Sequence, residues 1–355
     1  MTVWDIIRLR RWSASRAFLR PVMFRPNLRI LTNSHVKSLR FNGKRCAGVE
    51  FWRDDTLCAA DASGEVILAA GAIGSPQLLQ VSGIGPSTLL SQHGIPTVLE
   101  LPGVGENMQD HWVLRLTFRA SNTVTMNEWV NNPLRRYVMG AYYLATRRGP
   151  MGFTVPQMGL HARTNSTQES ANVQLNISPA TSDRMGGPLH SHPGMSCVTV
   201  ALRPPAVGYC RIKSADPQVH PSIRHNFLET TEAQQVAVDA LKLARTITAG
   251  SALARFTPTE MLPGADVRTD AELLSYARET VSTIFHQSGT CKMGPANDRM
   301  AVVDEKLRVR GIEALRVVDA SIMPKLASGN TNAPVMMIAE KAAAMIRADR
   351  SVDRR

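Results

Sequence analysis

The residues best suited to chemistry lie near the end of the chain, in two polar segments separated by an apolar strand. Residues 285–294 read Phe-His-Gln-Ser-Gly-Thr-Cys-Lys-Met-Gly and carry His286, whereas residues 329–334 read Gly-Asn-Thr-Asn-Ala-Pro. The second segment opens a helical pattern, and the amino end of a helix stabilises a nearby anion by roughly 0.3–1 kcal/mol. This suits a group that becomes negative during a reaction. A capped core helix beside a surface histidine explains the same spacing, and on spacing alone it is the commoner case.

Two elements position these segments. Residues 315–318 form a short apolar run that predicts a buried strand, and the run stops at an acidic turn that begins with Asp319. Apolar residues then recur with helical spacing between positions 335 and 346. Pro334 would lie in the first turn of this helix, and Asn332 would cap it. We expect residues 349–355 to form a charged, frayed tail.

A second segment with a strand, a glycine turn and a helix lies earlier in the chain. Residues 66–70 are continuously apolar, which predicts a strand covered on both faces. In the following stretch, residues 71–85, we expect Ser75 to cap a short helix, Pro76 to take its first position and Gly83 to end it. Glycines at such a turn allow a backbone to approach a phosphate closely. A tight joint without any ligand is the alternative.

Composition limits the possible classes of function. The chain has 355 residues, a net charge of +12 and a pI of about 10.0, which on their own suggest nucleic-acid binding. Only 8 of the 41 basic residues are lysine, and the arginines are dispersed without a basic block. We therefore interpret the charge as a solvated surface and predict no nucleic-acid partner. No apolar run has the length of a transmembrane helix. Five scattered cysteines favour a reducing compartment over a disulfide framework.

The remaining periodicity divides the chain into two kinds of structure. Residues 28–41 and 46–52 predict a β-hairpin around Asn42 and Gly43. Farther along, strand-like runs at 113–119, 172–177, 196–202 and 209–212 are grouped apart from helical patterns at 133–146, 231–249 and 270–280. This grouping favours an antiparallel sheet with helices on one face. We interpret Asp110 and His111, which close the segment 101–111, as structural residues that hold loop backbone.

The two C-terminal segments and the segments 71–85 and 101–111 together resemble the glucose–methanol–choline (GMC) flavoprotein oxidoreductases, most closely the choline and alcohol dehydrogenase branch. The resemblance implies an α/β fold with an α+β substrate domain. A Rossmann-like FAD-binding domain would comprise residues 1–112 and 283–355. The antiparallel-sheet substrate domain would comprise residues 113–282. The resemblance also implies a cytoplasmic protein, or one that is peripheral at the inner membrane.

The resemblance assigns roles to individual residues. His286 would be the acid/base in alcohol oxidation, and Asn330 would be its partner, 330 − 286 = 44 residues later. The implied substrate is a small alcohol, and the implied electron acceptor is oxygen, a quinone or a dye. FAD would meet the backbone of Val36 at its adenine end. The other implied FAD contacts are Ala70, Gly71, Asp319, Ala320 and Asn332.

One expected element is missing from the sequence. A dinucleotide site normally opens with a strand, Gly-x-Gly-x-x-Gly and a helix, and no such run occurs in these 355 residues. The chain thus resembles a family member that lacks its N-terminal βαβ unit, so residues 66–70 would lose neighbours in their sheet and FAD would bind weakly. Two alternatives stay open: a non-catalytic remnant that does not bind FAD, and a lyase that keeps FAD for structure.

Overall fold

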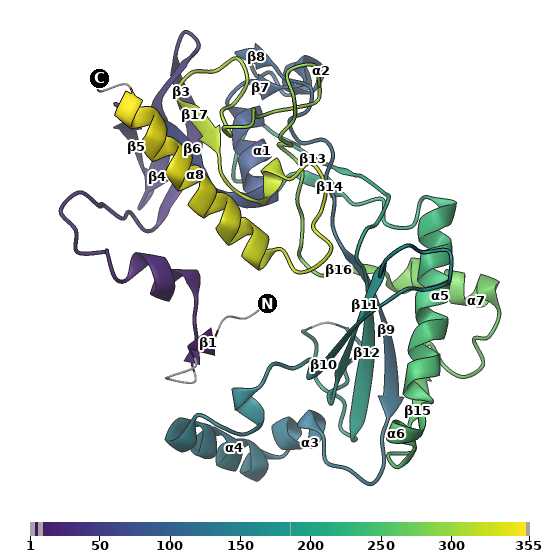
Figure 1. Ribbon diagram of the computed structural model, residues 1–355. Helices are drawn as coiled ribbons and strands as arrows, with labels where there is room; N and C mark the ends of the chain where they lie inside the picture. Colours follow the sequence, from purple (N-terminus) through teal and green to yellow (C-terminus); the bar gives the residue numbers. More distant parts are fainter. Residues whose placement is uncertain (1–3, 6–9, 185, 353–355) are drawn as a thin grey trace. The chain divides into compact units, whose positions relative to one another are not determined.

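The computed structural model describes residues 4–5, 10–184 and 186–352, and these form two compact units (Figure 1). Unit 1 comprises Met1–Arg29, His111–Pro205 and Leu228–Ile284, and unit 2 comprises Ile30–Asp110, Ala206–Phe227 and Phe285–Arg355. The divisions near 110 and 284 lie close to those that the sequence suggests. Residues 1–29, however, belong to unit 1, and residues 206–227 belong to unit 2. The sequence suggested the opposite for both ranges.

Unit 1 is built on an antiparallel sheet, as predicted. Its strands lie in the order β10-β11-β12-β9-β15, and β16 also pairs with β9. The bounds are β9 Trp112–Arg119, β10 Met158–Ala162, β11 Val173–Ser178, β12 Gly194–Ala201, β15 Thr259–Leu262 and β16 Ser282–Thr283. The periodic runs predicted β9, β11 and β12. They did not indicate β10, whose residues are mostly exposed and therefore show no apolar alternation.

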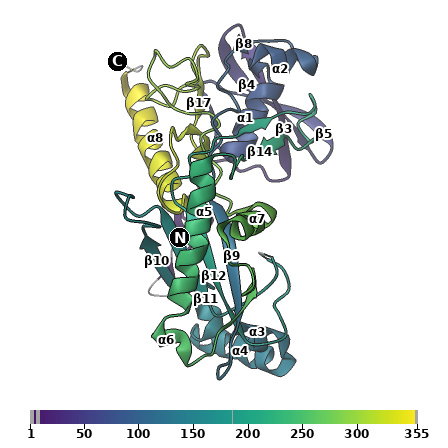
Figure 2. The same cartoon turned by 90° about the vertical axis from the view of Figure 1, so that its right-hand side faces the viewer.

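Two helices pack on this sheet, and Figure 2 shows α5 running along its strands. α5, Thr231–Thr248, buries a stripe of small and apolar residues, and the Thr230 hydroxyl accepts the N–H of Ala233 at its start. α7, Asp270–Thr280, begins with a capping box between Thr269 and Glu272. Unit 1 also contains α3 Met126–Asn131, α4 Pro133–Thr146, α6 Ser251–Ala254, η1 Ser15–Leu19, η2 Pro150–Gly152 and the strand pair β1 Trp4–Asp5 and β2 Arg10–Arg11.

Unit 2 contains several small sheets instead of one large one. A three-stranded meander joins β3 Ser34–Asn42, β4 Arg45–Arg53 and β5 Thr56–Asp61, and its first turn is centred on Gly43 and Lys44, one residue beyond the predicted position. β6 Val66–Leu68 pairs in parallel with β17 Leu315–Val317. The remaining pairs are β7 Ile84–Gly85 with β8 Leu99–Glu100 and β13 Tyr209–Arg211 with β14 Ser222–Arg224.

The helices of unit 2 pack on a large apolar core, apart from a small separate cluster of Leu90, Ile95 and Ile212. They are α1 Gly71–Val81, α2 Ser87–Gln92, the short η3 Ala320–Ile322 and α8 Asn332–Val352, which is yellow in Figure 1. Side chains from α1, β17 and α8 meet in this core, among them Leu79, Val317 and Ile338. In the described residues β6 is paired only with β17. Ile67 is 43% exposed, so the prediction that this strand is covered on both faces is wrong.

The carboxyl end of α8 differs from the prediction of a frayed tail. The helix continues to Val352, and residues 353–355 lie outside the described part of the chain. The carboxylate of Asp349 forms ion pairs with Lys306 at 3.2 Å and with Arg308 and Arg316 at 2.8 Å each. Arg316 is buried and also pairs with Glu65 at 2.7 Å. Long-range pairing therefore holds this helix end, which a local pattern cannot indicate.

We expect Asp349→Asn to lower the free energy of unfolding by about 1–2 kcal/mol, because charge-assisted bonds are lost from a carboxylate that is only partly exposed. Hydrogen bonds from the three cations lower the pKa of Asp349 below its usual range. Its contribution is therefore present above about pH 4 and is lost as the pH falls further. Urea unfolding at pH 7 and pH 3 measures this, with the exposed-turn variant Asp216→Asn as the control. A difference between Asp349→Asn and the unsubstituted chain that does not shrink at pH 3 would contradict the assignment.

Among the described residues, no helix is both long and apolar enough to span a bilayer. The cysteines are unpaired, and four of them are buried. Burial raises the pKa of Cys197 and of Cys210 to about 12, so both remain protonated thiols at neutral pH. They act as small core residues in this structure.

Candidate active site

The carboxyl ends of β6 and β17 bring two predicted binding segments together. Parallel strands end at the same edge of a sheet, and here the residues that follow them are bonded to each other. Oδ2 of Asp319 accepts the backbone N–H of Gly71 at 2.9 Å and the hydroxyl of Ser75 at 2.6 Å. Its other oxygen accepts the N–H of Ser321 at 2.8 Å. Of the predicted FAD contacts, Ala70, Gly71, Asp319 and Ala320 therefore lie at one edge.

The start of α1 corrects one expectation. Ser75 was predicted to cap this helix, but α1 begins four residues earlier at Gly71, and Ser75 lies buried inside its first turns. The Ser75 hydroxyl accepts the N–H of Ala70 at 3.2 Å and donates to Asp319. The acceptor at the helix start is thus the Asp319 carboxylate, which comes from 248 residues farther along the chain. Local sequence rules do not find a cap of this kind.

Val36 and Asn332 occupy other parts of unit 2. Val36 is half-buried on β3, at the outer edge of the meander, where an irregularity in the register separates it from Ser38. Asn332 was expected to cap α8 but is its first helical residue, and the carbonyl of Thr331 accepts the N–H of Val335. Pro334 lies in the first turn, as predicted. The side chains of Asn332 and Ala333 are exposed, so this helix start is open to a ligand.

His286 and Asn330 face each other. Nδ2 of Asn330 lies 3.4 Å from Nε2 of His286, although 44 residues separate them in the chain. His286 is half-buried and Asn330 is exposed. An amide N–H that donates to Nε2 leaves the ring hydrogen of the neutral imidazole on Nδ1, so Nε2 is the basic atom. A hydroxyl group placed here can give its proton to a nitrogen and receive a hydrogen bond from an amide.

Gln109 braces both of these loops, a role that sequence reasoning missed. Gln109 exchanges two backbone hydrogen bonds with Ser288, at 3.0 and 2.9 Å. Its side chain donates to the carbonyl of Pro324 and accepts the N–H of Leu326, each at 3.0 Å. One residue therefore connects the loop that carries His286 with the loop that leads to Asn330. The interpretation of the segment 101–111 assigned a structural role to Asp110 and His111 but none to Gln109.

Asp110 and His225 also belong to this site. The interpretation of Asp110 as a residue that holds loop backbone agrees with the structure, because its Oδ1 accepts the N–H of His286 at 2.9 Å. Its Oδ2 lies 3.3 Å from Nε2 of His225, a residue that sequence reasoning left unassigned. Spacing could not have found His225, since Asp110 and His225 lie on segments far apart in the chain. His111, by contrast, is buried in unit 1 with Nε2 3.1 Å from the carbonyl of Leu202, as expected of a structural residue.

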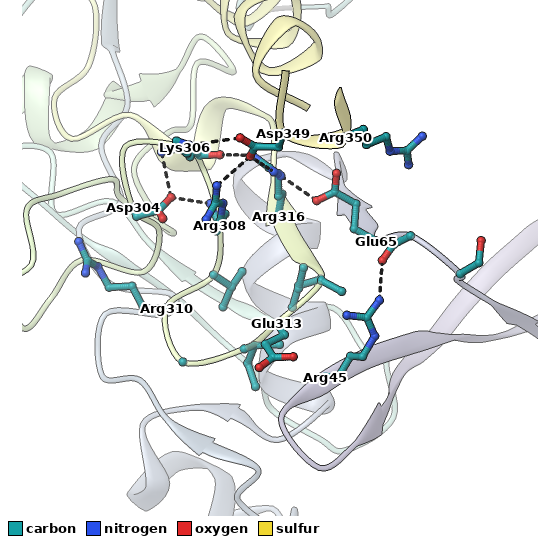
Figure 3. Close-up of a pocket in the computed structure, with 17 residues that line it drawn as sticks. Arg45, Glu65, Asp304, Lys306, Arg308, Arg310, Glu313, Arg316, Asp349 and Arg350 are labelled. Carbon is teal, nitrogen blue, oxygen red and sulfur yellow. Dashed lines mark hydrogen bonds and ion pairs between the residues drawn. The ribbon is translucent and has the colours of Figure 1, made fainter. Parts of the chain in front are cut away.

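A polar cavity of about 930 Å³ lies at the opposite edge of the β6–β17 pair, beyond the amino ends of both strands. Figure 3 shows the charged side chains that surround it, with Asp349 and Arg316 at the centre of the ion pairs. None of the predicted site residues lines this cavity. Its charges join β17 to the end of α8 and are explained by that structural role.

The residues at the carboxyl edge fit a dinucleotide cofactor. Ala70 is exposed, and Gly71 has a φ of 79° with no atom within 4 Å of the place where a Cβ would stand. This leaves backbone accessible for a phosphate or ribose, while the open start of α8 suits the part of a ring that becomes anionic. The accessible backbone at Ala70 and Gly71 and the exposed start of α8 are thus compatible with FAD.

Comparison with known proteins agrees with this architecture. Two sequence models described as GMC oxidoreductase match residues 5–113 and 204–339, which together make up more than half of the chain. The chain therefore belongs to the GMC oxidoreductase family, which confirms the resemblance seen in the sequence. Among curated relatives, it is 40% identical to the oxygen-dependent choline dehydrogenase of Serratia proteamaculans over 95% of this chain and 61% of the relative. The corresponding enzyme of Escherichia coli O6:K15:H31 is 40% identical over 97% of this chain and 62% of the relative.

Solved structures give the same result. An FAD-dependent oxidoreductase from Chaetomium thermophilum resembles this chain with a TM-score of 0.87 at 25% identity. The match covers 98% of this chain and 66% of that protein's chain. Pyridoxine 4-oxidase from Mesorbium loti resembles this chain with a TM-score of 0.82 at 28% identity. The match covers 96% of this chain and 62% of that protein's chain. The mixed α/β fold class is confirmed. The chain spans about three fifths of the length of the curated relatives it matches.

Proposed function

We propose that this chain carries the catalytic part of an FAD-dependent oxidoreductase that acts on the CH–OH group of a small alcohol, of the choline or alcohol dehydrogenase type. The observation that supports this most is the 3.4 Å approach of Asn330 to Nε2 of His286. It lies in the same unit as the carboxyl-edge residues that fit FAD. When bound, the flavin supplies the two-electron acceptor for the substrate carbon.

The side chains of this unit would perform the proton chemistry. Nε2 of His286 removes the hydroxyl proton as a general base, a role that typically contributes 10²–10⁴-fold to a rate. Nδ2 of Asn330 donates a hydrogen bond to the substrate oxygen and holds it beside the imidazole. The start of α8 stabilises negative charge that develops nearby. FAD would be held by Val36, Ala70, Gly71, Asp319, Ala320 and Asn332.

A second candidate is a non-catalytic form that keeps the fold and does not retain FAD. One observation favours it: β6 and β17 form a sheet of only two strands within the described residues. The two candidates differ in a property that can be measured directly, which is flavin retention by the folded chain.

The visible absorption spectrum of the purified chain, with and without added FAD, tests the proposal. We expect the folded chain to bind added FAD, and we expect choline or another small alcohol to bleach the band of the bound flavin without oxygen. Turnover with an artificial dye, compared with turnover in oxygen, then identifies the electron acceptor. A chain with native circular dichroism that retains no flavin would reject the enzyme and favour the non-catalytic form.

A further inference from the structure

The loop that carries His286 contains a strained residue immediately before the imidazole. Phe285 has a φ of 63°, in the left-handed region, although it is not a glycine and its side chain is 71% exposed. Such a conformation is strained and persists only where the surroundings hold it. The hydrogen bond from the N–H of His286 to Asp110, at 2.9 Å, fixes the backbone at the next residue. The orientation of the imidazole therefore depends on where the Asp110 carboxylate lies.

The Asp110 carboxylate is itself held by His225. The side chain of Asp110 is fully buried, and a buried carboxylate is costly unless donors or positive charge compensate it. Nε2 of His225 lies 3.3 Å from Oδ2, on the side away from the oxygen that binds His286. The His225 ring is fixed in turn by stacking on Phe227, with ring centroids 4.6 Å apart. A path of contacts thus leads from Phe227 through His225 and Asp110 to the catalytic loop.

Nε2 of His225 can donate a hydrogen bond to Asp110 only if this nitrogen carries a hydrogen. Nε2 also lies 3.5 Å from Nε2 of Gln287, the residue that follows His286. A ring nitrogen cannot donate to the carboxylate and accept from an amide N–H at the same time. An ionised carboxylate can only accept, so the state in which His225 donates to Asp110 satisfies the buried charge.

We propose that His225 is a positioning residue for the reaction: its Nε2–H holds the Asp110 carboxylate in the orientation that fixes the backbone of His286 opposite Asn330. The inference rests on the proposed function for its catalytic consequence, but not for its structural part. A displacement of about 1 Å at a catalytic group can lower a rate by roughly 10²-fold. His225 therefore acts on catalysis although it transfers no proton itself.

Two variants separate the hydrogen-bond donor from the ring. His225→Phe keeps an aromatic ring to stack on Phe227 and removes the donor, whereas His225→Gln removes the ring and keeps an N–H. With selective ¹⁵N-histidine labelling, the backbone amide of His286 reports its hydrogen bond to Asp110 without any flavin. We expect this amide resonance to shift upfield in His225→Phe and to stay within its original line width in His225→Gln. Asp110→Asn should shift it in the same direction as His225→Phe.

The kinetic test uses the flavin-loaded chain. We expect His225→Phe to lower kcat about 10-fold with KM changed less than twofold, and His225→Gln to restore kcat to within twofold. A His286 amide that does not move in a folded His225→Phe variant would overturn the proposal. So would a loss of kcat in His225→Gln that equals or exceeds the loss in His225→Phe, since the retained N–H donor would then not preserve the rate. If the chain retains no flavin, the amide resonance still decides the inference, and only the proposed function fails.

Discussion

His286→Ala is expected to lower alcohol-dependent turnover of the flavin-loaded chain by about 10²–10⁴-fold, because Nε2 is the basic atom opposite the Asn330 amide. The effect should fall on kcat, and FAD binding should not change, since His286 is absent from the carboxyl-edge set that fits the cofactor. Anaerobic flavin reduction by an alcohol, followed in a stopped-flow instrument, measures the chemical step directly. His220→Ala is a matched control, because His220 is an exposed histidine of the same unit.

A double-mutant cycle extends this prediction to the pair. His286→Ala and Asn330→Ala should be strongly non-additive, since both act on the same substrate oxygen and the second change removes little once the first is made. Additive losses would show that the two side chains act independently and would contradict the pairing. An Asn330→His variant should retain more activity than Asn330→Ala, because it keeps a donor near that position.

Asp319→Ala is expected to lower the free energy of unfolding by about 3 kcal/mol, because it leaves three donors, two of them buried, without an acceptor, each worth roughly 1–3 kcal/mol. Those donors are the N–H groups of Gly71 and Ser321 and the hydroxyl of Ser75. Asp319 is only 5% exposed, so water cannot readily replace the carboxylate. Urea unfolding monitored by circular dichroism measures the change.

Asp216→Ala provides the comparison for Asp319→Ala. Asp216 also accepts a backbone N–H, from Gln218 at 2.9 Å, but it does so in an exposed turn. Its loss should cost at most about 0.5 kcal/mol. Equal effects of the two substitutions would mean that the Asp319 contacts do not carry the start of α1.

The sequence predicted elements whose signals are local, and it missed contacts that are not. Residues 133–146 and 270–280 were predicted as helices and form α4 and α7 with those bounds, because apolar periodicity and caps lie within each segment. The predicted start of α1 was wrong, because the group that accepts the N–H at the helix start is the carboxylate of the distant Asp319. The pairing of His286 with Asn330 came from the resemblance to the family. His225 gave no signal, because nothing in a linear sequence places it against Asp110.

The bond between Gly71 and Asp319 also has a consequence for protein synthesis. Unit 2 is assembled from three separate stretches of chain, and its last stretch begins only at Phe285. The ribosome must add 248 residues between Gly71 and its acceptor, which takes roughly 12–50 s at 5–20 residues per second. During this interval α1 and β6 have emerged without β17 or the carboxylate that completes them. Nascent chains of this protein are therefore expected to expose apolar surface for tens of seconds, long enough for chaperones to bind, until the final residues leave the ribosome.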